Sequence, residues 1–186
     1  MLKTFAHFVL KFFGWTLDVK LPEEKKFILI GAPHTSNWDL PLALLAFWTV
    51  EPKIYWLAKI QIFRGPLHYL FTALGGIPID RSTPHELINR IAEKFNHIDG
   101  MVLSIAPEGT RSKTDYWKSG FYYIALIAKV PICFGYIDYK TRTLGFKQLM
   151  HPSGNIEADM KIISGFYRNI KGKRPQNQGP VRLRNR

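Results

Sequence analysis

The stretch that decides the fold is Gly31-Ala32-Pro33-His34-Thr35-Ser36-Asn37-Trp38-Asp39-Leu40. It follows the apolar run 27–30, which has the length of a buried strand, and it precedes apolar residues at helical spacing over 42–50. The stretch is therefore predicted to be a turn from a strand into a helix. In α/β sheets such turns lie at the carboxyl ends of strands, where functional sites form.

His34 and Asp39 are the two residues of this turn with acid–base chemistry. On a regular helix a separation of five residues places side chains about 140° apart. Pro41 is tolerated only in a first helical turn, so the helix is predicted to begin near Trp38 or Asp39. Asp39 can then fold back onto His34, and a histidine oriented by a carboxylate is typical of a general base. An alternative is that Asp39 only caps the helix, because Ser36 and Asp39 have capping-box spacing.

Two further polar loops follow apolar strands. One contains Glu108, Gly109, Thr110 and Arg111, and the other contains Arg81. Arginine can hold a phosphate through two parallel hydrogen bonds, so both loops indicate phosphate recognition. Glu108 is assigned to an acceptor hydroxyl or to fixing Arg111. The alternative for each loop is an ordinary surface turn with neighbouring acidic and basic residues.

Length and composition predict one domain. The 186 residues are enough for one core, and 46% hydrophobic with 14% aromatic residues excludes disorder. Apolar strand runs alternate with helical patterns, which predicts an α/β fold with a mainly parallel central sheet flanked by helices. The predicted units are an amphipathic helix over 1–15, the domain over 16–170 and a basic, flexible tail over 171–186.

The N-terminal helix carries apolar residues over a wide face, with Lys3 and Lys11 beside it. This pattern predicts a helix that lies on a membrane surface, and packing onto the domain is the alternative. No apolar run approaches the roughly 18 residues that would span a bilayer.

The charge of the chain favours an anionic partner. The net charge is +12, and the chain from Lys161 onward has eight Lys or Arg and no Asp or Glu. The partner could be an anionic membrane surface or a nucleic acid. Nucleic-acid binding predicts basic residues interleaved with exposed aromatics, and the tail after Lys171 has no aromatic residue. We therefore predict a membrane partner and no nucleic-acid partner.

Two nucleophile classes are disfavoured by the sequence. The single cysteine, Cys133, lies in the apolar run 130–134, which predicts a buried structural thiol in a reducing compartment. A serine hydrolase is not expected, because the chain has no Gly-x-Ser-x-Gly nucleophile elbow.

Four motifs occur in order along the chain. They are the HxxxxD of His34 and Asp39, then Gly76-Ile77-Pro78-Ile79-Asp80-Arg81, Pro107-Glu108-Gly109-Thr110-Arg111-Ser112 and Val130-Pro131-Ile132. Together they resemble the successive motifs of the glycerolipid acyltransferase superfamily, which includes 1-acylglycerol-3-phosphate and glycerol-3-phosphate acyltransferases. The resemblance covers about residues 27–136. Pro33 stands where many relatives have Asn, and Ala106 where Phe is frequent.

The resemblance implies an O-acyltransferase of phospholipid biosynthesis. In that superfamily the histidine deprotonates the acceptor hydroxyl, so the resemblance makes His34 the general base and Asp39 its orienting partner. It implies a glycerol phosphate or lysophospholipid acceptor, acyl-CoA or acyl carrier protein as the donor co-substrate, and neither a metal nor another cofactor. The substrate-binding positions that it implies are Arg81, Glu108, Gly109, Thr110 and Arg111.

The implied location is the cytoplasmic face of a membrane, with peripheral or monotopic attachment. A non-catalytic lipid- or acyl-carrier-binding module with the same fold is the alternative, and the presence of both His34 and Asp39 argues against it. An apolar pocket is expected to set the length of the acyl chain. Candidates for its lining are Trp56, Phe63, Phe71 and Tyr122.

Overall fold

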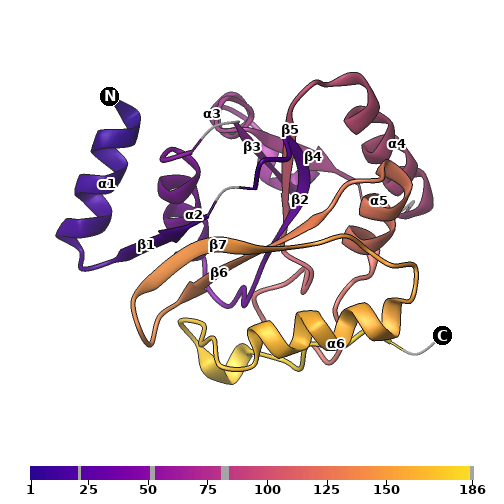
Figure 1. Ribbon diagram of the computed structural model, residues 1–186. Coiled ribbons are helices and arrows are strands. Elements are labelled where there is room, and N and C mark those ends of the chain that lie inside the picture. The colour runs from indigo at the N-terminus through magenta and orange to yellow at the C-terminus, as the bar shows by residue number, and fades with distance from the viewer. Residues whose placement is uncertain (21, 51–52, 81–83, 185–186) are drawn as a thin grey trace.

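The computed structural model describes residues 1–20, 22–50, 53–80 and 84–184. Within these residues, a seven-stranded sheet forms the centre of the molecule (Figure 1). In sheet order its strands are β1 (Thr16–Val19), β7 (Thr143–Met150), β6 (Ile132–Asp138), β2 (Lys26–Gly31), β5 (Met101–Ile105), β3 (Ile54–Lys59) and β4 (Gly76–Ile79). Neighbouring strands are parallel except for β6 and β7. The predicted α/β fold with a mainly parallel sheet is confirmed.

Helices cover both faces of the sheet. They are α1 (Leu2–Phe12), α2 (Asp39–Phe47), α3 (Leu67–Ala73), α4 (Pro84–His97), α5 (Gly120–Ala128) and α6 (Ile156–Tyr167), with short 3-10 turns at Ile60–Phe63 and Pro175–Asn177. One core cluster joins the sheet to α4, α5 and α6, and two others join it to α1, α2 and α3. Figure 1 shows α1 and α2 on the left and α4, α5 and α6 to the right and below.

The central strand β2 shows why the molecule has these two layers. Successive side chains of a strand point to opposite faces of the sheet. Phe27 and Leu29 pack in the cluster with α1 and α2, whereas Ile28 and Ile30 pack in the cluster with α4, α5 and α6. All four are buried, as expected for a parallel sheet covered on both faces. Cys133 packs in the cluster with α1 and α2 and is buried, as the sequence predicts, and burial raises its pKa to about 12.

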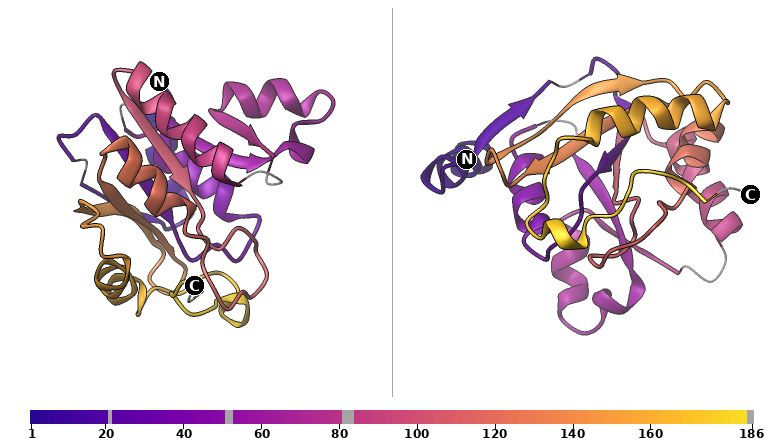
Figure 2. Two further views of the ribbon diagram at one scale, coloured as in Figure 1. Left: turned by 90° about the vertical axis from the view of Figure 1, so that its right-hand side faces the viewer. Right: turned by 90° about the horizontal axis from the view of Figure 1, so that it is seen from below.

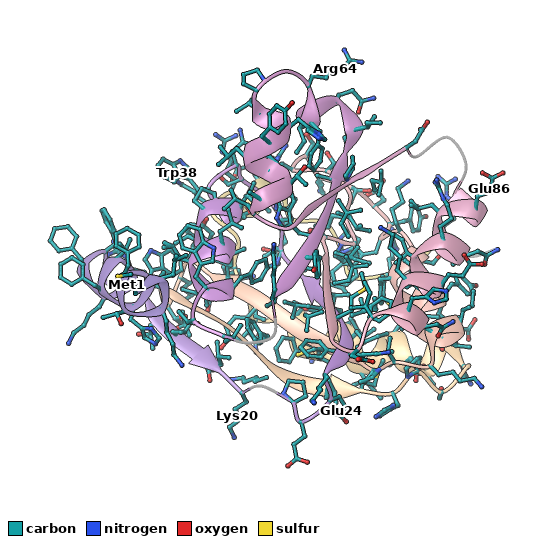
Figure 3. The ribbon with its side chains drawn as sticks, turned by 90° about the horizontal axis from the view of Figure 1, so that it is seen from above. Met1, Lys20, Glu24, Trp38, Arg64 and Glu86 are labelled. Carbon is teal, nitrogen blue, oxygen red and sulfur yellow. The ribbon has the colours of Figure 1, made fainter. Side chains whose placement is uncertain are left out.

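The N-terminal helix α1 touches the domain through a narrow face. Ala6 and Leu10 are buried, and Leu10 packs in the same core cluster as Phe146. The opposite face carries exposed apolar side chains, and Figure 3 shows rings on α1 near Met1 that point away from the rest of the molecule. These exposed residues are Leu2, Phe5, Phe8, Phe12 and Phe13. In the part of the chain that the structure describes, no helix has the length and apolar character needed to cross a membrane.

The C-terminal segment lies on the domain instead of extending from it. The sequence predicts a flexible tail over 171–186, whereas the structure places residues 171–184 along the surface (Figure 2). Trp117 forms a bridge with Leu183, and its backbone N–H donates to the carbonyl oxygen of Arg182 at 2.8 Å. Polar composition suggested a tail, but backbone hydrogen bonds need no apolar side chains and hold the segment in place.

Candidate active site

Three neighbouring strands end at the candidate site. β2 pairs in parallel with both β5 and β6, so the carboxyl ends of all three lie at the same edge of the sheet. His34 follows β2, Glu108 follows β5 and Tyr139 follows β6. Residues far apart in the sequence therefore meet here.

His34 and Asp39 form the pair that the sequence predicts. The Nδ1 atom of His34 lies 3.1 Å from Oδ2 of Asp39. A carboxylate only accepts hydrogen bonds, so Nδ1 is the donor of this pair, and in the neutral imidazole Nε2 then keeps its lone pair. The His34 side chain is 21% exposed and that of Asp39 only 6%, so the base is reachable while its partner is shielded. Helix α2 begins at Asp39, with Pro41 in its first turn.

The Asp39 carboxylate also organises the turn itself. Its Oδ2 atom accepts hydrogen bonds from the backbone N–H groups of Thr35 and Ser36, both at 2.9 Å. Its Oδ1 atom accepts from the hydroxyl of Tyr139 at 2.8 Å. Asp39 does not cap the helix, because the N-cap of α2 is Trp38 and no side chain caps it. The carboxylate of Asp39 instead holds both the preceding turn and the imidazole of His34.

Glu108 braces the same turn from the neighbouring strand. Its Oε2 atom accepts a hydrogen bond from the backbone N–H of His34 at 2.7 Å, and the residue is 5% exposed. The sequence assigns Glu108 to an acceptor hydroxyl or to Arg111. Among the described residues Arg111 has no ion-pair partner, so the expected pairing with Glu108 is not formed.

The environment of Glu108 favours its protonated form. Burial raises its pKa from an ordinary 4.5 to about 7, the hydrogen bond from His34 opposes this rise, and the negative charge of Asp39 adds to it. Because the pKa is raised in the folded state, this group contributes stability that is fully present below about pH 4.5 and is lost as the pH rises to about 7.

We therefore expect Glu108→Gln to remove a pH dependence of stability. The amide oxygen of glutamine can still accept the His34 N–H, but it carries no charge. Relative to wild type, the free energy of unfolding of the variant should rise by up to about 3 kcal/mol between about pH 4.5 and 8. Urea denaturation at matched pH values measures this difference. Glu157→Gln, at an exposed position of α6, is the control, and a difference for Glu108→Gln that does not vary with pH would contradict the expectation.

The other predicted substrate-binding residues lie beside this centre or outside the described residues. Gly109 has a φ of 67°, a left-handed conformation that favours glycine in this loop. Thr110 and Arg111 are exposed, and Arg111 lines the same pocket as His34. Arg81 lies outside the described residues. Among the residues that are described, no group of three or more His, Cys, Asp or Glu side chains is placed to hold a metal ion.

The C-terminal segment joins the two loops of the site, a contact that the sequence analysis missed. The backbone N–H of Arg174 donates to Oγ1 of Thr35 at 3.2 Å, and the side-chain amide of Asn177 donates to the carbonyl oxygen of Arg111 at 3.0 Å. Gly172 packs so closely that a Cβ there would lie 2.5 Å from Oγ1 of Thr35. Figure 2, seen from below, shows this yellow segment beside the violet turn before α2.

An apolar pocket opens beside His34, between α2 and the sheet. Its cavity volume is about 170 Å³. Ala43 and Phe47 of α2 line one side, and Gly31 and Ser104 of the strands line the other. The small residues leave the space open, since a Cβ on Gly31 would meet no atom closer than 4.0 Å.

The structure separates the four candidates for the lining of this pocket. Trp56 lines it directly. Phe63 stacks on Trp56 and Phe71 meets it edge to face, with ring centroids 6.1 and 5.8 Å away, so both support the wall from behind. Tyr122 lies on α5, in the core cluster of the opposite layer, and is not part of the pocket.

Comparison with known proteins identifies the family. A protein-family model described as Acyltransferase matches residues 16–135, more than half of the chain. The chain belongs to the Acyltransferase family. It is also similar to a crystal structure of the 1-acyl-sn-glycerophosphate (LPA) acyltransferase PlsC from Thermotoga maritima. That match has a TM-score of 0.62 and 20% sequence identity, and it covers 90% of this chain and 76% of that one. No curated protein sequence gives a significant match.

The family match covers only part of the site. It includes His34, Asp39 and the loop with Glu108. It ends before Tyr139 and the C-terminal segment, which therefore contribute to the site from outside the matched region. The predicted membership of an acyltransferase superfamily is confirmed, and the PlsC likeness agrees with the observed fold.

Proposed function

We propose that this acyltransferase moves a fatty acyl group from an acyl thioester to a hydroxyl group of a glycerol phosphate or lysophospholipid. The observation that carries the proposal is the His34–Asp39 pair at 3.1 Å beside an apolar pocket. A hydroxyl acceptor needs a base, and an acyl chain needs an apolar wall. The PlsC relative is named as an acyltransferase for 1-acyl-sn-glycerophosphate, which supports this class of acceptor.

In the proposed reaction, His34 acts as the general base. Its Nε2 atom takes the proton of the acceptor hydroxyl as the oxygen attacks the thioester carbonyl carbon. A C–O bond forms, the C–S bond breaks, and the leaving thiolate takes the proton from His34, so the histidine returns to its starting form. Base assistance of this kind contributes about 10²- to 10⁴-fold to the rate.

Asp39 supports the imidazole through both orientation and charge. Its Oδ2 atom fixes the Nδ1–H of His34 and faces the positive charge that develops on the ring during proton transfer. The carboxylate is held beforehand by the N–H groups of Thr35 and Ser36, so it needs little rearrangement when that charge appears.

The acyl chain and the acceptor phosphate bind at different places in this proposal. The acyl chain lies in the pocket beside Trp56 and Phe47. A phosphate of the acceptor binds the guanidinium of Arg111, which lines the same pocket near His34, and Arg81 is the second proposed cation. Among the described residues no carboxylate pairs with Arg111, so its charge is available to an anionic ligand.

An acyl-transfer assay with the purified chain tests the proposal. Radiolabelled acyl-CoA and acyl carrier protein are each offered with glycerol-3-phosphate, lysophosphatidate or a phosphate-free monoacylglycerol. We expect ester formation with a phosphate-bearing acceptor and weaker transfer to the phosphate-free one. Binding of lipid or carrier protein without turnover on any acceptor would favour a non-catalytic binding module.

We further propose that α1 attaches the enzyme to the surface of an anionic membrane. The aromatic side chains that it exposes include Phe8 and Phe12, which are 67% and 73% exposed and lie one helical turn apart. Lys3 and Lys11 are also exposed on this helix and can reach lipid phosphates. An exposed apolar face flanked by lysines is typical of helices that lie in the membrane interface.

Removing the two phenyl rings should therefore weaken membrane binding. Full burial of a Phe side chain is worth about 1.5–3 kcal/mol, so we expect Phe8→Ser/Phe12→Ser to bind anionic phospholipid vesicles at least about tenfold more weakly. Co-sedimentation with vesicles measures this binding. Ile162→Ser on α6 is the control, since Ile162 is also exposed but lies on another helix. Equal binding of both variants and wild type would contradict the proposal.

A further inference from the structure

The Asp39 carboxylate accepts hydrogen bonds unevenly at its two oxygens. Oδ2 takes three donors, namely the Nδ1 of His34 at 3.1 Å and the backbone N–H groups of Thr35 and Ser36 at 2.9 Å each. Oδ1 takes the hydroxyl of Tyr139 at 2.8 Å. The Tyr139 hydroxyl is the donor that the structure gives to Oδ1, so it adds a restraint on the rotation of the carboxylate.

The ring of Tyr139 is itself held in place. Tyr139 comes one residue after β6 ends, and its backbone N–H donates to the carbonyl oxygen of Lys171 at 2.9 Å. Its ring meets Trp15 edge to face, with centroids 5.1 Å apart. The hydroxyl therefore reaches Asp39 from a side chain fixed at both its backbone and its ring.

We propose that Tyr139 is a positioning residue for acyl transfer, acting through Asp39 on His34. Its hydroxyl holds Oδ1, so that Oδ2 keeps facing the imidazole when substrate binds. This inference rests on the proposed function of the His34–Asp39 pair. It adds a residue from outside the matched region 16–135.

The hydroxyl of Tyr139 is suited to this role because it remains a donor. Burial and the hydrogen bond to Asp39 both raise the pKa of Tyr139 above its usual value of 10. The phenol therefore keeps its proton at neutral pH. Without the Tyr139 hydroxyl, Oδ1 would lose the one donor that the described residues give it. The carboxylate could then turn, and the three donors of Oδ2 would be shared between both oxygens.

Tyr139→Phe tests this inference, because phenylalanine keeps the ring against Trp15 and removes only the hydroxyl. With acyl-CoA and the best acceptor, we expect kcat to fall by about 10- to 100-fold, the range for losing a hydrogen bond to a charged group. The KM of both substrates should stay within about twofold, because Tyr139 acts on the proton transfer and not on binding. Unchanged kcat, or a rise in KM alone, would overturn the inference.

Tyr122→Phe is the matched control. The hydroxyl of Tyr122 donates to Oδ2 of Asp159 at 2.8 Å, the same distance, but this pair joins α5 to α6 in the other layer. Removing this hydroxyl should lower the thermal midpoint and leave kcat of the folded enzyme unchanged. If both Tyr variants lose kcat in proportion to lost stability, Tyr139 is only structural.

A double variant separates positioning from general disturbance of the site. Since Tyr139 acts through His34, adding Tyr139→Phe to His34→Ala should cause no further loss of the residual rate. An additional loss equal to that of the single variant would overturn the inference. If the wild type is active and Tyr139→Phe is equally active, only this inference is wrong. If the wild type is inactive with every donor and acceptor, the proposed function is wrong as well.

Discussion

Replacement of His34 with alanine should lower kcat for acyl transfer by about 10²- to 10⁴-fold, the range for general-base assistance. The variant removes the only imidazole beside the pocket in the described part of the chain. Its fold should persist, because the turn keeps the hydrogen bonds of the backbone N–H groups of residues 34–36 to Glu108 and Asp39. Steady-state kinetics together with circular dichroism measure both properties.

His151→Ala provides the control for loss of an imidazole. The side chain of His151 is 70% exposed and lies after β7, away from the candidate site. This variant should keep its rate within about twofold of wild type. A His34→Ala enzyme that retains more than about a tenth of the wild-type rate would contradict the role of His34 as general base.

Asp39→Asn should slow acyl transfer by about 10²-fold or more while leaving the turn folded. The amide oxygen of asparagine can take the place of Oδ2 and accept from Thr35, Ser36 and His34. The amide NH₂ then faces Tyr139, whose hydroxyl can accept instead of donate. The geometry is kept, so the loss of rate measures the negative charge that faces the imidazole.

Asp159→Asn is a matched control for this change. Asp159 is also a buried carboxylate, and it accepts hydrogen bonds from the hydroxyl of Tyr122 and from Ser153, but it lies on α6. We expect this variant to change stability and not the rate of the folded enzyme. Loss of folding in Asp39→Asn, with normal activity in the fraction that folds, would contradict the electrostatic role of Asp39.

The parts of the site that the sequence predicts are local. The spacing of His34 and Asp39, with Pro41 two residues on, was enough to place the histidine in the turn and the carboxylate at the start of α2. The alternation of strand and helix patterns was enough for the mainly parallel sheet. The spacing and each strand or helix pattern depend on residues within a few positions of one another.

The parts that the sequence analysis missed depend on strand order. Glu108 meets the backbone of His34 because β5 lies beside β2, and Tyr139 meets Asp39 because β6 lies on the other side of β2. No local pattern encodes which strands are neighbours. The same limit applies to the pocket, since Trp56 and Tyr122 have similar apolar surroundings in the sequence but lie on opposite faces of the sheet.

The placement of the C-terminal segment could not be predicted from the sequence for a different reason. Its Gly, Pro, Gln and Asn residues are typical of flexible tails, and it buries few apolar side chains. Its position comes from the hydrogen bonds of Arg174 and Asn177 to the two loops of the site, together with the bridge between Leu183 and Trp117. Such contacts leave no periodic signal in the sequence.

The measurement that tests His34 catalysis most directly follows free thiol and ester product together. Wild type and His34→Ala are each mixed with acyl-CoA, with and without lysophosphatidate. If His34 activates the acceptor hydroxyl, wild type releases thiol and forms ester in equal amounts, only when acceptor is present, and His34→Ala does neither at a comparable rate. Thiol release without acceptor, or equal ester formation by His34→Ala, would contradict acyl transfer by this histidine.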